Sequence, residues 1–221
     1  MWGEARFQDR SEAGRKLAEA ILEAGAPSNP VVLALPRGGV PVAYEIATRL
    51  RAPLDLLIVR KIGAPGHPEF GIGAVIDGAH PQTVINDEAA AYTGATADYI
   101  EQQTQKELAE IDRRRKIYLG DREPVALGGR HVILVDDGIA TGGTVRAALK
   151  GLRQAGVGSV LLAVPTAPPD VLAALEEQVD RTVCLDTPDR FGSVGAQYMN
   201  FEQTTDDEVI SLLEKAAAFR R

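Results

Sequence analysis

The residues of this chain with the clearest chemical potential lie in the stretch VILVDDGIATGGT, residues 132–144. Four apolar residues at its start predict a buried strand, and Asp136 and Asp137 follow where that strand ends. A loop of small residues, 138–143, then leads to a helix that we expect to open at Thr144. Ligands of open α/β sheets bind at the carboxyl ends of strands, and a glycine-rich turn before a helix presents backbone amides to phosphate. We therefore expect a phosphorylated ligand here.

The two acids need a role other than phosphate binding, because a carboxylate repels a phosphate. Asp136 and Asp137 would suit either a pair of sugar hydroxyls, whose hydrogen bonds they would accept, or a divalent cation. The ligand that fits both the acids and the loop is a ribose phosphate, with its diol at the acids and its phosphate at the loop.

This run resembles the phosphoribosyl pyrophosphate (PRPP) signature of the type I phosphoribosyltransferase family, which has an apolar strand, two acids and a TGGT-like loop. The resemblance implies that Asp136 and Asp137 bind the ribose hydroxyls and that the loop binds the 5′-phosphate. It also implies Mg²⁺ as a cofactor that accompanies PRPP, with the same two acids as its protein ligands. The loop residues that it assigns to PRPP are Ala140, Thr141, Gly142, Gly143 and Thr144.

A second loop with glycines follows the first predicted strand, VVLAL. Gly38 and Gly39 would let backbone amides approach an anion, and Arg37 would add a charge-assisted contact. In the resembling family this loop binds pyrophosphate and often carries a cis non-proline peptide. We predict Arg37 as a catalytic residue and the two glycines as PRPP ligands, with an ordinary strand-to-helix turn as the alternative.

Two adjacent cations, Arg60 and Lys61, close the second predicted strand, residues 54–59. The segment VRKIGAPG resembles one in adenine phosphoribosyltransferases, where the cations meet the pyrophosphate. We predict both as catalytic residues that stabilise charge on the leaving group. A solvated strand end is the alternative.

The segment PDRF, residues 188–191, resembles a stretch of hypoxanthine-guanine phosphoribosyltransferases in which the aromatic ring stacks on the purine. Phe191 is therefore the predicted base-binding residue, since an aromatic face in a cleft fits a planar base. Tyr198 and Phe201 either share this role or only pack. Hypoxanthine-type enzymes carry an acid at the position of Ala140, so their acid–base assistance is in doubt for this chain.

Strands that alternate with helices predict a parallel, twisted α/β sheet flanked by helices, with a small hood. The expected strands cover residues 31–35, 54–59, 132–136, 159–165 and 181–185, with a hairpin over 70–86. The expected helices cover residues 9–23, 40–50, 96–119, 143–154, 169–178 and 205–219. We expect a core domain over 1–185, which includes a long insertion at 62–130, and a hood with the last helix over 186–221. The charge run 113–116 is expected to be a solvated helix face.

Composition narrows the class of protein. The chain has 221 residues, 45% of them hydrophobic, which is ample for one core. Its net charge of −7 argues against a general nucleic-acid surface, and its single cysteine excludes an intramolecular disulfide. No apolar run approaches membrane-spanning length, and the charged segment MWGEARFQDR is unlike a secretory signal. We expect a cytoplasmic protein whose partners are PRPP and a nitrogenous base, without nucleic acid or membrane; a homo-oligomer stays open.

The resulting hypothesis is a phosphoribosyltransferase that moves the phosphoribosyl group of PRPP to a nitrogenous, purine-like acceptor. A non-catalytic sensor of PRPP or a nucleotide is the alternative within the same fold, and a metal-dependent phosphate-ester hydrolase is a third. A Walker loop is excluded because Gly142-Gly143-Thr144 lacks the lysine, and a dinucleotide fingerprint is excluded because PRGG follows the first strand.

Overall fold

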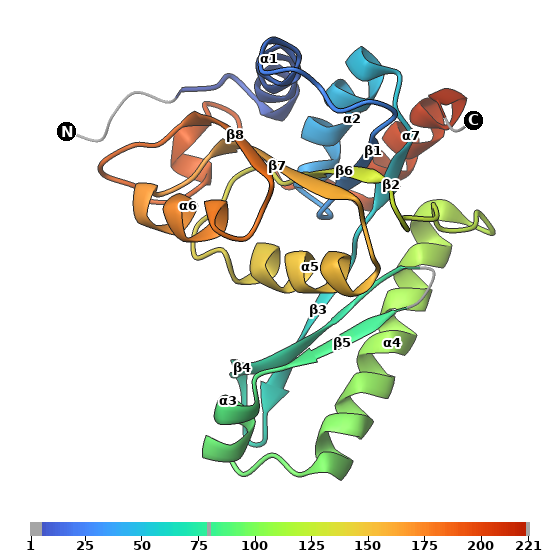
Figure 1. The fold of residues 1–221 in the computed structure, drawn as a ribbon, viewed down its shortest axis with the longest axis vertical. Coiled ribbons are helices and arrows are strands. Elements are labelled where there is room, and N and C mark those ends of the chain that lie inside the picture. The colour runs from blue at the N-terminus through green and yellow to red at the C-terminus, as the bar shows by residue number, and fades with distance from the viewer. Residues whose placement is uncertain (1–5, 79–80, 220–221) are drawn as a thin grey trace.

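The main sheet has five parallel strands, in the order β2-β1-β6-β7-β8 (Figure 1). It is seen in a computed structural model that describes residues 6–78 and 81–219. The chain adds β2 on one side of β1 and later adds β6 on the other, so the direction of sheet building reverses between β1 and β6. Ligands bind at such reversal points. The strands are β1 Val31–Ala34, β2 Leu54–Leu56, β6 His131–Val135, β7 Ser159–Thr166 and β8 Arg181–Asp186.

Helices cover both faces of this sheet, which confirms the predicted fold class (Figure 1). One face carries α1 (Arg10–Glu23), α2 (Gly39–Leu50) and α7 (Asp206–Ala216). The other carries α5 (Gly143–Gln154) and α6 (Pro169–Glu176). The chain between β8 and α7 includes the short helix η1 (Gly195–Gln197), and η2 (Ala217–Phe219) follows α7. The division into domains at residue 185 stays a prediction.

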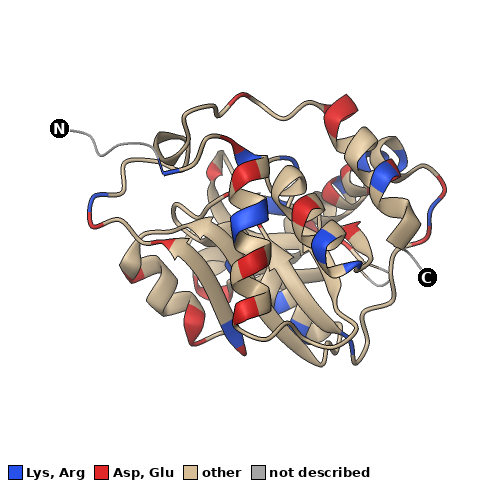
Figure 2. Cartoon of the chain, turned by 90° about the horizontal axis from the view of Figure 1, so that it is seen from above, with Lys and Arg blue, Asp and Glu red and all other residues tan. Residues whose placement is uncertain are grey.

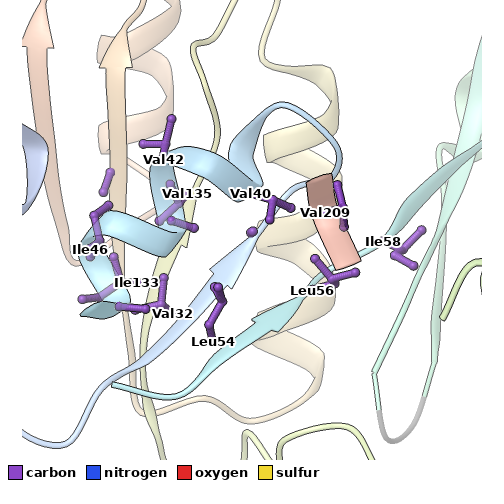
Figure 3. Close-up of a cluster of buried hydrophobic side chains, with 14 of the residues drawn as sticks. Val32, Val40, Val42, Ile46, Leu54, Leu56, Ile58, Ile133, Val135 and Val209 are labelled. Atoms are coloured by element: carbon purple, nitrogen blue, oxygen red, sulfur yellow. The ribbon is translucent and has the colours of Figure 1, made fainter. Parts of the chain in front are cut away.

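The core on the α2 side fixes the strand ends that carry the two glycine loops. Figure 3 shows Val32, Ile133 and Val135 of β1 and β6 near Ile46 of α2, with Val209 of α7 farther along the same cluster. All five side chains are fully buried. Burial of one aliphatic side chain of this size stabilises the fold by about 1.5–3 kcal/mol. The loops after β1 and β6 therefore project from a tightly packed base.

The segment after β2 differs from the expectation of one strand over 54–59. The structure ends β2 at Leu56 and starts β3 (Val59–Ala64), which belongs to a second, antiparallel sheet with β4 (His67–Ile76) and β5 (Gln82–Ile85). The two residues between β2 and β3, Leu57 and Ile58, are buried, so the apolar run continues across the boundary between the sheets. The pair β4–β5 is the expected hairpin.

A long helix ties the second sheet to the core. It is α4 (Ala97–Leu119), as predicted, and it follows a short helix, α3 (Asp87–Tyr92), that was not predicted. The Arg115 guanidinium of α4 is 2.5 Å from the Asp77 carboxylate and 3.3 Å from that of Asp55. Both acids are buried, and the Arg115 side chain is only 11% exposed. The expectation that the charge run 113–116 is a solvated helix face is therefore wrong at Arg115, which pairs with acids 38 and 60 residues away in the chain.

Charges of both signs are interspersed along the helices. Figure 2 shows the basic and acidic segments alternating on the helices of this view rather than separating onto two sides. Among the residues that the structure describes, no helix combines the length and apolar character needed to cross a membrane.

Candidate functional site

The loops after β1 and β6 meet at the carboxyl end of the sheet. The backbone amide of Leu35 donates to the carbonyl of Val135 at 2.9 Å, which aligns the two strand ends. A Cβ atom built on Gly38 would lie 2.0 Å from Oδ2 of Asp137, and one built on Gly39 would lie 2.8 Å from the Val135 carbonyl oxygen. Both positions therefore require glycine, because any side chain would collide with the neighbouring loop. The Pro36–Arg37 peptide in this loop is cis.

The loop between β6 and α5 forms an open cradle of backbone amides. Gly138 and Gly142 have φ angles of +155° and +74°, which favour glycine. Gly142 is the residue that caps α5, and it has no side chain to accept hydrogen bonds from the first amides of the helix. Thr141 and Gly143 are exposed beside it. The arrangement suits an anion such as a phosphate group.

The two acids lie between these loops. Oδ1 of Asp136 accepts a hydrogen bond from the backbone amide of Asp137 at 2.9 Å. Burial raises the pKa of the Asp136 carboxyl well above its ordinary value, and the neighbouring Asp137 carboxylate adds to the effect. Burial also raises the pKa of Asp137, although the Arg10 guanidinium opposes this. A carboxylate pair in such a position is poised to gain a hydrogen-bond donor or a cation.

Arg10 is a member of the site that the sequence did not reveal. Its Nε donates to Oδ2 of Asp137 at 2.8 Å, and its guanidinium lies 3.8 Å from the centre of the Phe201 ring. The Tyr198 hydroxyl donates to the backbone carbonyl of Asp137 at 2.5 Å. Arg10 follows Asp9, whose side chain caps α1, and this capping pattern marks a helix start rather than a contact with residue 137.

Arg37 points toward the start of the last helix. Its Nη1 lies 3.4 Å from Oδ1 of Asp206, which also accepts a hydrogen bond from the Tyr118 hydroxyl at 2.7 Å. That hydrogen bond holds the pKa of the Asp206 carboxyl below its ordinary value. Neither Asp206 nor Tyr118 was singled out from the sequence, since each lies in a helix pattern far from any motif.

Arg60 and Lys61 do not end a strand of the main sheet, as expected; they lie within β3 of the second sheet. Nε of Arg60 is 2.7 Å from Oε2 of Glu107 in α4, and the Glu107 side chain is buried. Lys61 is exposed. The structure thus gives Arg60 a carboxylate partner, and the predicted contact of both cations with pyrophosphate stays a prediction.

The predicted base-binding residue, Phe191, is half-buried in the segment that joins β8 to η1. Tyr198 and Phe201 instead form a stack, with ring centres 5.1 Å apart, and Phe7 packs on Tyr198 at 5.5 Å. The Arg10 guanidinium lies over the Phe201 ring of this stack. The side chain of Val194, in the same segment, reaches Gly138, where a built Cβ would lie 2.6 Å from Val194 Cγ1. The segment therefore caps the loop that follows β6.

Comparison with known proteins places these features in a family. Residues 6–198 match the family model of the phosphoribosyl transferase domain. A protein of Mycobacterium tuberculosis, represented from two strains and named a putative phosphoribosyl transferase, is 44% identical over 210 residues. That match covers 95% of this chain and 47% of the relative, so the chain spans about half the length of the curated relatives that it matches.

A solved structure shares both sequence and fold with the chain. The crystal structure of TT1426 from Thermus thermophilus has a TM-score of 0.83 and 42% sequence identity, over 95% of this chain and 98% of that one. The match of the family model spans the two glycine loops, the acid pair and most of the segment that caps them. The chain therefore belongs to the phosphoribosyl transferase domain family.

Proposed function

We propose that this chain transfers the phosphoribosyl group of PRPP to a nitrogenous acceptor and releases pyrophosphate. The observation that carries the proposal is the meeting of two glycine loops around one acid pair, with Gly38 against the Asp137 carboxylate. A cradle of amides at α5, carboxylates for a diol and a second glycine loop with Arg37 are the three sites that a sugar with a phosphate and a pyrophosphate would need.

In this reaction the bond between C1 of the ribose and the pyrophosphate oxygen breaks, and a bond from C1 to the acceptor nitrogen forms. The acceptor nitrogen then gives up its proton to solvent. The residues of the chain would act by position and charge: Asp136 and Asp137 would hold the diol, and the loop from Ala140 to Thr144 would anchor the 5′-phosphate. Arg37 would stabilise the charge that builds on the departing pyrophosphate.

Mg²⁺ would accompany PRPP, with Asp136 and Asp137 as its protein ligands. The donor set fits, because Mg²⁺ is commonly bound by one or two carboxylates together with phosphate oxygens and water. Within the described residues no group of three or more His, Cys, Asp or Glu gathers to hold a metal, so the other ligands would be oxygens of the substrate and water. When bound, the ion would neutralise part of the pyrophosphate charge.

The proposed acceptor is a purine-like base, stacked on Phe191. Two buried polar atoms at the same edge of the sheet support a polar acceptor: Oγ1 of Thr166 and Oδ2 of Asp186 lack a hydrogen-bond partner. These residues are register partners at the ends of β7 and β8. Buried polar atoms are normally hydrogen-bonded, so N–H and carbonyl groups of a base would suit them.

The test is calorimetric titration with PRPP and Mg²⁺, followed by a screen for pyrophosphate release with purines, pyrimidines and simple amines. We expect micromolar PRPP binding and release of pyrophosphate with at least one purine. Tight PRPP binding without release for any acceptor would contradict transfer and favour the non-catalytic sensor. Absence of PRPP binding would contradict both.

A further inference from the structure

We propose that Arg10 is a positioning residue for the ribose hydroxyls and acts through Asp137. The inference rests on the proposed function, because it concerns how the Asp137 carboxylate is presented to the sugar. Arg10 lies at the start of α1, 127 residues before Asp137 in the chain, and no motif of the sequence connects the two.

The contact between the two residues is short and shielded. Nε of Arg10 lies 2.8 Å from Oδ2 of Asp137, and the two side chains are only 12% and 14% exposed. A charge-assisted hydrogen bond of this length is stronger than one between neutral groups. Its burial also removes most of the solvent screening that weakens surface ion pairs. Arg10 therefore determines where one oxygen of this carboxylate lies.

Arg10 is itself held on two further sides. Its Nη1 donates to the backbone carbonyl of Glu202 at 2.7 Å. Its guanidinium lies over the Phe201 ring, 3.8 Å from the ring centre, and that ring stacks on Tyr198 with an angle of 29° between the planes. A planar guanidinium satisfies these contacts together, whereas a lysine ammonium has neither the flat face nor the fork of donors.

Asp137 is confined from the opposite sides. Gly38 leaves the space that its carboxylate occupies, and the Tyr198 hydroxyl holds its backbone carbonyl at 2.5 Å. An ionised carboxylate offers about four acceptor positions on its two oxygens. Arg10 uses Oδ2, so Oδ1 is the oxygen that this arrangement would direct to a sugar hydroxyl. Without Arg10, the Asp137 carboxylate would lose the contact that sets its orientation.

The experiment measures recognition of the sugar hydroxyls rather than stability. Calorimetry compares ribose 5-phosphate with 2-deoxyribose 5-phosphate, which lacks one hydroxyl of the diol. We expect the unaltered protein to prefer ribose 5-phosphate by about tenfold or more, and Arg10→Gln to reduce this preference to about threefold or less. The affinity for 2-deoxyribose 5-phosphate should stay within about twofold, because its phosphate contacts are intact.

Two matched variants sharpen the test. Arg15→Gln removes an exposed cation from the same helix, which pairs with Glu45 at 3.4 Å, and it should leave the preference unchanged. Arg10→Lys keeps the charge and loses the stacked plane, so it should also lower the preference. It serves in place of Arg10→Gln if that variant does not fold.

A double-mutant cycle asks whether Arg10 acts through Asp137. In a protein that already carries Asp137→Asn, adding Arg10→Gln should cause no further loss of preference, because the two residues form one unit. An additional loss would overturn the inference, as would an unchanged preference in Arg10→Gln or an equal loss of affinity for both sugars. If the unaltered protein bound neither sugar phosphate nor PRPP, the proposed function itself would fall, and this inference with it.

Discussion

The Arg37 guanidinium lies 3.4 Å from the Asp206 carboxylate, which joins the loop after β1 to the first turn of α7. The same carboxylate accepts the hydroxyl of Tyr118 from the end of α4. Both side chains of the ion pair are partly exposed, so the pair contributes little stability by itself. A pyrophosphate that entered this loop would replace Asp206 as the partner of Arg37 at small cost.

We expect Arg37→Ala to lower the rate of pyrophosphate release by at least tenfold, about 1.4 kcal/mol of transition-state stabilisation. The affinity for a nucleoside monophosphate should change much less, since that ligand has no pyrophosphate for Arg37 to meet. Paired measurements of release and of monophosphate binding check this. Arg49→Ala is the control, because Arg49 is an exposed arginine of α2 that pairs with Glu19. Equal losses in both measurements would show that Arg37 acts elsewhere.

The amide cradle at the start of α5 predicts the effect of changing its two threonines. The double variant Thr141→Val and Thr144→Val removes two hydroxyl donors beside the exposed helix start, so PRPP affinity should fall at least tenfold, or about 1.4 kcal/mol. Calorimetry on the variant, with the exposed Thr48→Val as a control, provides the measurement. Undiminished affinity would contradict the assignment of the phosphate to this loop.

The raised pKa of the Asp136 carboxyl predicts that the free energy of unfolding depends on pH. Burial raises this pKa, so the folded protein holds the proton more tightly than the unfolded chain does. The free energy of unfolding should therefore fall as pH rises from the unfolded pKa, about 4, toward the higher folded pKa. Asp136→Asn cannot ionise, so it should be more stable than the unaltered protein at pH 7.

Denaturation curves in metal-free buffer at several pH values test this difference, which should shrink as pH approaches 4. Other acids contribute to both proteins and cancel in the comparison. The variant should also lose affinity for ribose 5-phosphate. A variant that is less stable at pH 7, with ribose 5-phosphate affinity intact, would mean that Asp136 serves the fold rather than the ligand.

Substitution of Arg60 by alanine should lower the free energy of unfolding more than substitution of Lys61 does. Arg60→Ala would leave the buried Glu107 carboxylate unpaired, at a cost of about 1–2 kcal/mol, less than for a fully buried pair because Arg60 is one-third exposed. Adding Glu107→Gln should recover most of this loss. Lys61→Ala, at an exposed position, should change stability by less than about 0.5 kcal/mol.

Lys61 is therefore the cleaner test of a pyrophosphate contact from β3. We expect Lys61→Ala to lower pyrophosphate release with unchanged melting temperature. Normal release by this variant would contradict the catalytic role that the sequence predicted for Lys61.

The sequence by itself determined the features that depend on neighbours in the chain. The order of apolar strand, two acids, small-residue loop and helix in 132–144 is local, and it predicted β6, the acid pair and the start of α5 within one residue. The alternation of apolar runs with amphipathic segments predicted the parallel sheet and its helices for the same reason. The spacing of apolar residues and the positions of glycines determine structure over only a few residues, so both can be recognised directly in the sequence.

Only the tertiary structure decided which distant groups meet. The apolar run from Leu56 to Val59 continues from the main sheet into the second. Both sheets bury apolar side chains, so only the strand pairing shows where β2 ends. Arg10 reaches Asp137 across 127 residues because α1 packs on the sheet face, and Phe201, from the segment after η1, lies against the guanidinium. An arginine at a helix start is ordinary in sequence; its partner is set by how the helices pack.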